Sequence, residues 1–533
     1  MKYKLLTLFA VFLPFLGMAQ DEGLDQRIDK AFKPVSDFFS DVIFFTLPIG
    51  GYDVPFVLML LVASALFFTI YFGFPNIRYF GKAINTVRGK YDDVEHGHAA
   101  NPELAIDGDI RDTIRDESEE GEVSHFQALA TAVSGTVGNG NIAGVALAIA
   151  LGGPGATFWM IICGLLGMST KFVECTLGVQ YRDVGEDGTV YGGPMYYISK
   201  GLKERGFKTF GKIAAIVFSI FCIGGSFGGG NAAQSNQATI VLKELMGLDS
   251  TSAGAVIGLV LAILVGIIII GGIKRIASVT EKVVPFMAVM YLLACLYIIF
   301  SNFGLIDDAI GLIITEAFKP TAIGVGSVIG VLLVGFKRAA FSNEAGAGSA
   351  SIAHSAVKTK YSASEGLVAL LEPFIDTVVI CTMTALVIII FNFGGFFEYG
   401  GDGSGSVMID GQAFEGAGIT SKAFAQYIPY SNVFLTIAVV LFAVSTMISW
   451  SYYGLQSWKF LFGRGKAADL TYKLLFLTFV VIGAAASMGS IWAFSDAMIF
   501  AMVFPNMVGL FFLFPVVKKE LVRYMEAIRA IKS

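Results

Sequence analysis

Long apolar segments separated by short polar loops recur along almost the whole chain. A run of about 20 mainly apolar residues is long enough to cross the hydrocarbon core of a bilayer as a helix. Such segments are predicted near residues 55–74, 124–151, 155–179, 212–240, 254–272, 280–300, 322–350, 366–392, 432–455, 472–490 and 494–516. The pattern therefore predicts an all-α polytopic membrane protein with about eleven transmembrane helices.

Positive residues gather in alternate loops, and this gives an expected orientation. Cytoplasmic loops collect lysine and arginine. If the first span runs inward, one set of loops carries these residues in groups, at 78–90, 182–212, 274–282, 358–360, 459–473 and 518–523. The opposite loops after the first span carry only Lys243, Lys319 and Lys422. We therefore expect a multi-pass protein of the cell (inner) membrane with its N-terminus outside and its C-terminus in the cytoplasm.

The first 122 residues precede the main series of spans. Residues 1–20 have a basic start, an apolar run and small residues near the end, as in a secretory signal peptide. In residues 21–54, apolar positions recur at helical spacing among charges. This fits an extracytoplasmic amphipathic helix on the membrane surface or, equally well, a helix packed on the protein. Residues 55–74 are predicted as an extra transmembrane helix, and residues 75–122 as a cytoplasmic loop that is solvated from Asp92 onward.

Composition supports a membrane protein and excludes other classes. The 533 residues are 55% hydrophobic and 15% charged, with a mean hydropathy of +0.70, whereas soluble domains carry about 25% charged residues. A net charge of −5 gives no basic surface for nucleic acid. The cysteines lie in apolar segments without metal-ligand spacing. The four histidines, His96, His98, His125 and His354, are expected near cytoplasmic surfaces, without a metal or catalytic role.

The segment from Gly135 to Gly144 places glycines, Thr136, Asn139 and Asn141 inside a membrane-length apolar run. Close helix packing explains isolated glycines, but polar amides at this depth need partners. Irregular backbone is tolerated in a membrane only where protein or water satisfies its polar groups. A helix broken here would offer N–H groups to a carboxylate and C=O groups to a cation, and an amino acid with a sodium ion suits that pairing.

A second segment of this kind runs over residues 335–348 and contains Asn343 and Glu344. The basic residues before them also allow an ordinary helix end at the interface. Glu344 fits either a pair with Arg338 or a contact with substrate or cation. With the extra helix set aside, the two segments lie in the first and sixth spans. Broken helices in corresponding positions of two halves indicate a transporter site, and an offset of five spans implies inverted repeats.

Two further spans carry polar side chains. Asn231 and Gln234 lie one helical turn apart, where interhelical hydrogen bonding is an equally good explanation for Asn231. Ser445 and Thr446 offer hydroxyl oxygens, which suit a hard monovalent cation, although such hydroxyls often only bond to the preceding turn. Trp450, one turn beyond Thr446, is placed to wall a small cavity.

Acidic residues in spans are candidates for ion coupling. Glu174, Glu281 and Glu372 lie near cytoplasmic ends, where interface charges are ordinary. Asp376 is of more interest than these three or Asp496. A proton-coupled amino-acid transporter of the same fold, with Glu344 or Asp376 as the proton carrier, is the alternative to sodium coupling.

Several long motifs resemble those of the alanine or glycine:cation symporters. They are GTVGNGNIAGVALAIALGGPGATFW, GMSTKFVECTLGVQYR, GGPMYYI, FSNEAGAGSASIAH and STMISWSYYG, in this order between about residues 120 and 516. The resemblance implies a leucine-transporter-like core of two inverted five-helix repeats, here residues 123–300 and 301–516, before a cytoplasmic tail at 517–533. It implies import of alanine or glycine with sodium as the coupling ion and no other cofactor. The signal-like start and the amphipathic segment are not part of these motifs.

The resemblance also assigns roles to residues of the broken helices and their neighbours. Backbone amides around Gly138, Asn139 and Gly140 would receive the substrate carboxylate. The substrate pocket would comprise Thr136, Gly138, Asn139, Gly140, Gln234, Phe341, Asn343 and Trp450. The sodium site would use Ser134, Val137, Ser445 and Thr446, and Asn141 would contact a second cation. Besides substrate, sodium and the lipid bilayer, no partner is indicated, and the oligomeric state stays open.

Overall fold

The computed structural model describes residues 24–49, 51–95, 121–185, 188–248, 250, 252–320, 327–401 and 403–530. The predicted signal peptide lies outside these residues. The described chain is helical apart from three two-stranded antiparallel hairpins, which pair β1 (Thr46–Ile49) with β2 (Tyr52–Pro55), β3 (Asp183–Val184) with β4 (Val190–Tyr191), and β5 (Val407–Ile409) with β6 (Gln412–Phe414).

The helices follow one another with short connections. The α-helices of the first part of the chain are α2 (Leu24–Ile43), α3 (Phe56–Tyr71), α4 (Pro75–Arg78), α5 (Phe80–Val87), α6 (Asp92–Glu95), α7 (His125–Thr136), α8 (Val145–Gly152), α9 (Gly155–Gln180), α10 (Pro194–Glu204), α11 (Lys208–Phe227), α12 (Ala233–Met246), α13 (Ala253–Ile269), α14 (Gly272–Ser301) and α15 (Ile306–Phe318). Those of the second part are α16 (Val328–Asn343), α17 (Ala350–His354), α18 (Ser362–Ala369), α19 (Leu371–Pro373), α20 (Thr382–Asn392), α21 (Ala417–Ala425), α22 (Ser431–Phe462), α23 (Lys466–Ala485) and α24 (Met488–Ala530). Short π-helical segments are η1 (Gly140–Gly144), η2 (Gly228–Ala232) and η4 (Phe374–Cys381), and η3 (Phe303–Leu305) is a 3₁₀ turn.

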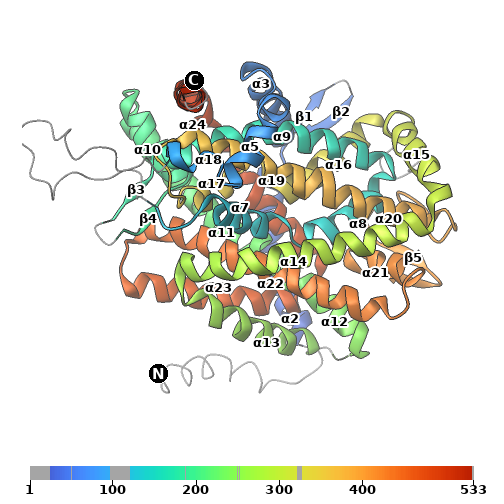
Figure 1. Ribbon diagram of the computed structural model, residues 1–533. Helices are drawn as coiled ribbons and strands as arrows, with labels where there is room; N and C mark the ends of the chain where they lie inside the picture. Colours follow the sequence, from blue (N-terminus) through green and yellow to red (C-terminus); the bar gives the residue numbers. More distant parts are fainter. Residues whose placement is uncertain are drawn as a thin grey trace, which may run out of the picture.

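The class predicted from the hydrophobic pattern is confirmed. Within the described residues, seven helices or continuous helix pairs are long and apolar enough to cross a membrane, and the bent pair α7 and α8 makes up to eight. The helices α3 and α13 are apolar but shorter. Figure 1 shows the long helices α9, α14, α16, α22 and α23 running side by side in one bundle.

The outer surface of the bundle is apolar, as a surface in contact with lipid must be. On α13 the side chains of Val256 and Ile267 are 62% and 55% exposed, and on α14 those of Phe286 and Leu293 are 63% and 61% exposed. Large apolar surfaces of this kind are unusual on soluble monomers. Polar side chains are instead buried inside the bundle, where they find partners among the helices.

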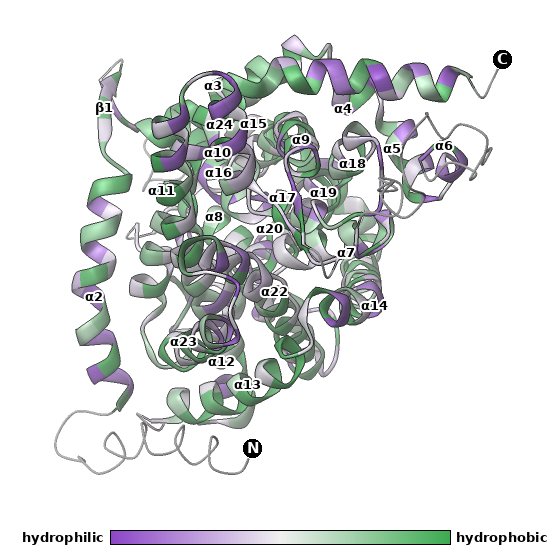
Figure 2. Cartoon of the chain, turned by 90° about the vertical axis from the view of Figure 1, so that its left-hand side faces the viewer, coloured by the Kyte–Doolittle hydropathy of each residue, from purple (hydrophilic) through white to green (hydrophobic). Residues whose placement is uncertain are grey.

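The helix α2 lies across the bundle instead of along it. Figure 2 looks along the bundle and shows α2 running up one side, with the last turns of α24 crossing the top. Phe32 and Phe39 pack edge-on against Phe494, and the Ser36 hydroxyl donates to the Ser490 carbonyl at 2.7 Å. The packed alternative for the amphipathic segment is therefore confirmed. The membrane-surface alternative stays a prediction for the other face of α2.

Two segments between the long helices are well structured. Glu95, expected in a solvated cytoplasmic loop, is fully buried at the end of α6. The Gly-rich segment 394–427 carries the β5–β6 hairpin and the buried helix α21. From α21 the Thr420 hydroxyl donates to the Ile142 carbonyl in η1 at 3.1 Å, so this segment packs onto an interrupted helix.

Candidate functional site

The first interrupted helix is formed by α7, η1 and α8. A capping box begins α7, because the Ser124 hydroxyl accepts the Gln127 N–H and the Gln127 side chain accepts the Ser124 N–H. The α-helix ends at Thr136, and the chain continues into η1 and α8 with a bend of 50°. Regular hydrogen bonding is lost between these two parts, as the glycines and asparagines of the sequence predict.

At this break, oxygen atoms of side-chain amides accept hydrogen bonds from the backbone N–H groups. The Gly138 N–H donates to Asn141 Oδ1 at 2.8 Å, and the Asn139 N–H donates to Gln234 Oε1 at 3.0 Å. The Asn139 side chain is 1% exposed, and its Oδ1 has no hydrogen-bond partner among the described residues. An unpaired buried acceptor is costly, so this oxygen is a candidate to bind a ligand.

The second interrupted helix is formed by α16 and α17. The α16 helix ends at Asn343, and Glu344 follows with a positive φ of 56°. Gly346 and Gly348 also have positive φ, at 96° and 84°, which is why glycine is needed in this turn. Asn343 stabilises the break, because its Nδ2 donates to Thr377 Oγ1 at 2.9 Å and its Oδ1 accepts the Ala345 N–H at 3.0 Å.

The two breaks lie next to each other. A Cβ added to Gly140 in η1 would be 3.6 Å from the Ser342 Cα and 3.7 Å from the Phe341 ring in α16. Phe341 also approaches η2, since a Cβ on Gly229 would be 3.4 Å from its ring. The neighbouring Gly230 leaves room for Trp450, whose ring a Cβ there would overlap at 2.1 Å. Of the predicted substrate residues, Phe341 and Trp450 thus close around the breaks together with η2.

The predicted sodium residues of α7 and α22 are also brought together. The Ser134 hydroxyl donates to the Ser445 carbonyl at 2.8 Å, and the Thr446 hydroxyl donates to the Ser134 carbonyl at 3.0 Å. The Ser445 hydroxyl instead bonds back to the Phe442 carbonyl at 3.0 Å, which is the alternative considered for helical hydroxyls. Val137, which follows the last residue of α7, is completely buried. The polar groups of Ser134, Ser445 and Thr446 that meet here are oxygen atoms, as a hard cation prefers, and the Met287 sulfur lies 3.5 Å from the Ser445 hydroxyl.

A carboxylate lies beside Asn141, in a cluster that sequence analysis did not assemble. Asp376 in η4 accepts hydrogen bonds from Asn141 Nδ2 at 2.6 Å, from the Ser342 hydroxyl at 2.9 Å and from the Thr377 hydroxyl at 2.7 Å. Asp376 is completely buried. Every hydrogen bond recorded to this carboxylate in the described chain comes from a neutral group. Such a site can stabilise a bound cation or hold a proton.

Glu344 does not pair with Arg338, so that alternative is wrong. Glu344 accepts a hydrogen bond from the Trp450 indole N–H at 2.9 Å and another from the Ser349 hydroxyl. Arg338 pairs with Asp496 and is 4% exposed, which rules out an ordinary helix end at the interface. Glu344 is thus a buried carboxyl group that contacts Trp450, one of the predicted pocket residues.

Several ionisable residues that were expected at the membrane surface are buried. Glu174 and Glu372 are 0% exposed, so the interface-charge interpretation is wrong for both. His125 and His354 are 5% and 0% exposed and contact acidic side chains, which corrects their placement near a surface. One residue of the sequence does point to buried acids of this kind. Lys171 in α9 lies inside a long apolar span, where a lysine needs an acidic partner.

The chain is similar to proteins of one transporter family. The profile of the sodium:alanine symporter family matches residues 48–533. The sodium/alanine symporter AgcS of Methanococcus maripaludis is 39% identical over 467 residues, which are 87% of this chain and 93% of AgcS. A Bacillus subtilis protein, named "Probable sodium/glutamine symporter GlnT", is 33% identical over 413 residues, 77% of this chain and 80% of that one. Among solved structures, MhsT in complex with L-phenylalanine is 12% identical with a TM-score of 0.49, over 75% of this chain and 99% of MhsT.

Proposed function

Because the chain belongs to the sodium:alanine symporter family, we propose that it imports alanine or glycine together with sodium ions by alternating access. Family membership establishes a membrane transporter that couples amino-acid movement to a cation, and not an enzyme. The finer proposal rests on the meeting of the two helix breaks, where polar groups from α7, α12, α16 and α22 converge. Paired broken helices at the centre of a bundle are where transporters of this kind bind substrate and ion.

The sodium ion is assigned to the contact between α7 and α22. The carbonyl oxygens of Ser134 and Val137 and the hydroxyls of Ser445 and Thr446 would surround it. Two of these groups, the Thr446 hydroxyl and the Ser134 carbonyl, already hydrogen-bond across the helices at 3.0 Å, and a cation between them would replace this bond with shorter contacts to oxygen. Sodium would then hold α7 against α22, which links ion binding to the shape of the neighbouring substrate site.

The amino acid is assigned to the first break. Asn141 Oδ1 and Gln234 Oε1 accept the N–H groups of Gly138 and Asn139, so these two amide oxygens stand where the carboxylate oxygens of a substrate would bind. Asn139 Oδ1, which has no partner in the described chain, would accept the substrate ammonium group. Phe341 stacks on Trp492 at 5.0 Å, and Trp450 is completely buried. These rings would restrict the substrate to one with a small side chain.

Proton coupling is the second candidate, and Asp376 favours it. A buried carboxylate that receives only neutral donors needs a proton or a cation to offset its charge. The nearby Asn141 and Ser342 supply further oxygen atoms, so a second sodium ion would fit the same place. With a proton at Asp376, a proton gradient would contribute to uptake, whereas with a second sodium ion the sodium gradient alone would drive it.

The topology belongs to the same proposal. Adding α3, α13 and the broken pair of α16 and α17 to the candidate spans gives the eleven crossings expected from the sequence. The spans after α3 then divide into two inverted five-helix repeats. The end of the bundle that carries α5, α10 and the last turns of α24 would face the cytoplasm, because the lysine-rich and arginine-rich loops lie there. The N-terminus would lie outside.

Counterflow and uptake in proteoliposomes test this function. Purified protein is reconstituted, and accumulation of radiolabelled alanine, glycine and serine is measured with an inward sodium gradient, with a proton gradient alone, and with neither. We expect concentrative uptake of alanine or glycine that requires sodium. Uptake driven by the proton gradient without sodium would establish the alternative, and Asp376→Asn would then abolish it.

A further inference from the structure

A continuous row of buried acids and bases leads away from the helix breaks. We call it the relay, and it consists of Glu95, His125, Glu365, His354, Glu372 and Lys171. Acids and bases alternate along it. His125 contacts Glu95 through one ring nitrogen and Glu365 through the other. Glu365 then contacts His354 Nδ1 at 2.5 Å.

The inner half of the relay continues the alternation. His354 Nε2 lies 3.6 Å from Glu372 Oε2, and Lys171 Nζ donates to Glu372 Oε1 at 3.0 Å. All six side chains are buried, with exposed fractions between 0% and 5%. Isolated buried charges are too costly to keep, so each group depends on its neighbours in the row.

The charges of the relay balance only when both histidines carry a proton. Three carboxylates then face two histidinium ions and one ammonium ion. With neutral histidines the row would hold two uncompensated negative charges in the protein interior. Glu174 and Glu344 are further buried carboxyl groups within electrostatic range of Lys171. The relay, with its acids and bases in contact as described, therefore binds protons.

The relay joins elements that must separate when the bundle opens at this end. His125 begins α7, and His354 ends α17, so each lies on the half of a broken helix that extends from its break toward this end. The two helices α7 and α17 pack against each other. Glu365 in α18 holds both histidines at once. A path from the breaks to this end of the molecule would have to part these helices and break the row.

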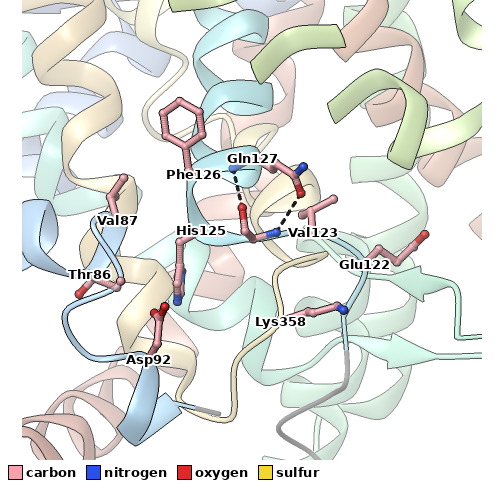
Figure 3. A pocket seen from close by; sticks show the side chains of 11 residues that line it. Thr86, Val87, Asp92, Glu122, Val123, His125, Phe126, Gln127 and Lys358 are labelled. Atoms are coloured by element: carbon pink, nitrogen blue, oxygen red, sulfur yellow. Dashed lines mark hydrogen bonds between the residues drawn. The ribbon is translucent and has the colours of Figure 1, made fainter. Parts of the chain in front are cut away.

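The outer end of the relay meets a surface pocket. The pocket has a volume of about 320 Å³ and is lined by Thr86, Asp92, His125 and Lys358, among others. Figure 3 shows the His125 ring pointing toward Asp92 at the edge of this pocket. At the other end of the row, Lys171 interacts with Glu344, which accepts the Trp450 indole N–H. The pocket thus reaches one end of the row at His125, and at the other end Lys171 lies within electrostatic range of the carboxyl group that holds Trp450.

We propose that the relay is a proton-binding site that holds the cytoplasmic end of the transporter shut. The inference rests on the orientation and the alternating access proposed above. Protons on His125 and His354 neutralise the row and keep α7, α17 and α18 together. Loss of these protons to the cytoplasm through the pocket leaves repelling carboxylates and favours opening. Because proton binding and closure are linked, an acidic cytoplasm slows release of the amino acid and an alkaline one speeds it.

Other ionisable groups face the relay and share its charge. They are Tyr524 of α24, whose hydroxyl donates to Glu95 at 2.5 Å, Glu174 and Cys175 of α9, Glu344 after α16, Tyr453 of α22, Tyr197 of α10, and Asp92 and Lys358 at the pocket. Of the relay residues and these surrounding groups, the histidines have the ordinary pKa closest to the cytoplasmic pH, so they are the groups to change.

The test uses right-side-out membrane vesicles with a fixed external pH and sodium concentration. The internal pH is set between about 6 and about 10, a range that extends above the ordinary histidine pKa because carboxylates beside both rings favour their protonated form, and the membrane potential is clamped with potassium and valinomycin. We expect initial alanine uptake by the wild type to rise several-fold across this range. The rise should be lost in His125→Gln and in His354→Gln. Glu281→Gln is the matched control, because Glu281 accepts a hydrogen bond from Gln127 on the first turn of α7 but lies outside the relay.

A second measurement does not depend on transport. The melting temperature of the purified protein should fall as pH rises through the same range, and the fall should be smaller in both histidine variants than in Glu281→Gln. Sodium-driven uptake that ignores internal pH, or histidine variants that keep the wild-type profiles, would overturn the relay. Wild-type protein with the expected melting profile but no sodium-driven uptake would instead contradict the proposed function and leave the proton site standing.

Discussion

The Thr446 hydroxyl donates a hydrogen bond of 3.0 Å to the carbonyl oxygen of Ser134, 312 residues earlier in the chain. The two groups can face each other because α7 is near its break, where backbone carbonyls lose their helical partners. The contact ties α7 to α22 and leaves oxygen atoms from both helices in one place. It is the point at which a sodium ion would couple the two helices.

The first prediction concerns the hydroxyl of Thr446. Thr446→Ala removes one oxygen of the proposed sodium site, so the sodium concentration for half-maximal uptake should rise by about tenfold, equivalent to about 1.4 kcal/mol. Thr446→Ser keeps the hydroxyl and should stay near the wild type. Initial uptake of alanine, measured against sodium concentration, distinguishes the two. Unchanged sodium dependence in Thr446→Ala would remove this residue from the site.

The second prediction uses two glycines of the first break as a matched pair. A Cβ at position 138 would lie 2.5 Å from Thr446 Oγ1 and 3.0 Å from Gln234 Oε1, whereas one at position 140 meets nothing closer than 3.6 Å. Gly138→Ala should therefore displace both side chains and reduce uptake at least tenfold. Gly140→Ala should have a much smaller effect. Equal activities of the two variants in the same uptake assay would show that crowding at Gly138 does not matter.

The sequence predicts the interrupted helices well, for a physical reason. Glycines and asparagines inside a membrane-length apolar run are locally costly, and the cost is visible without any partner. Both breaks are present, at Val137–Asn139 and after Asn343. The contacts between helices that assemble the site, in contrast, cannot be predicted from the local sequence. Nothing local in the chain indicates that Asp376 meets Asn141 and Ser342, because those distances depend on how three helices pack.

The relay shows even more clearly that contacts made by tertiary packing cannot be predicted from the local sequence. Each of its residues looks ordinary in sequence, since His125 starts a helix, Glu372 lies near a predicted helix end and Glu95 lies in an acidic loop. Their burial follows only from tertiary packing, when α6 and α24 close over the ends of α7 and α18. Lys171 is the exception, because a cation within an apolar span already implies an acidic partner.

The third prediction concerns the hydrogen bond between the Trp450 indole and Glu344. Trp450→Phe keeps an aromatic ring but leaves one Glu344 oxygen without its indole donor, which should destabilise the protein by about 1–3 kcal/mol. Glu344→Gln in the same chain should recover much of this loss, since the unpaired charge is gone. A double-mutant cycle on the melting temperature measures the coupling. Additive effects of the two substitutions would contradict a direct link.

The last prediction concerns the two aspartates by which α2 holds the bundle. Burial raises the pKa of Asp29, but hydrogen bonds from the Ser487 hydroxyl and N–H, from Ser490, and the charge of Lys33 outweigh it, so the pKa is lowered. Burial raises the pKa of Asp25, and hydrogen bonds from Gly254 and Ala255 with the charge of Lys243 only partly offset it. The two carboxylates therefore respond to pH with opposite signs.

A lowered pKa means that the folded state prefers the charged carboxylate, so the stability from Asp29 is present above its ordinary pKa of about 3.9 and is lost as pH falls. A raised pKa means the reverse for Asp25, whose charged form is disfavoured at neutral pH. Asp29→Asn should lower the stability at pH 7 by about 1 kcal/mol, the usual value of a capping carboxylate, and by less at pH 4. Asp25→Asn should cost less than this at pH 7. Melting curves at both pH values show which variant loses more stability. An equal loss in the two variants at neutral pH would contradict the prediction.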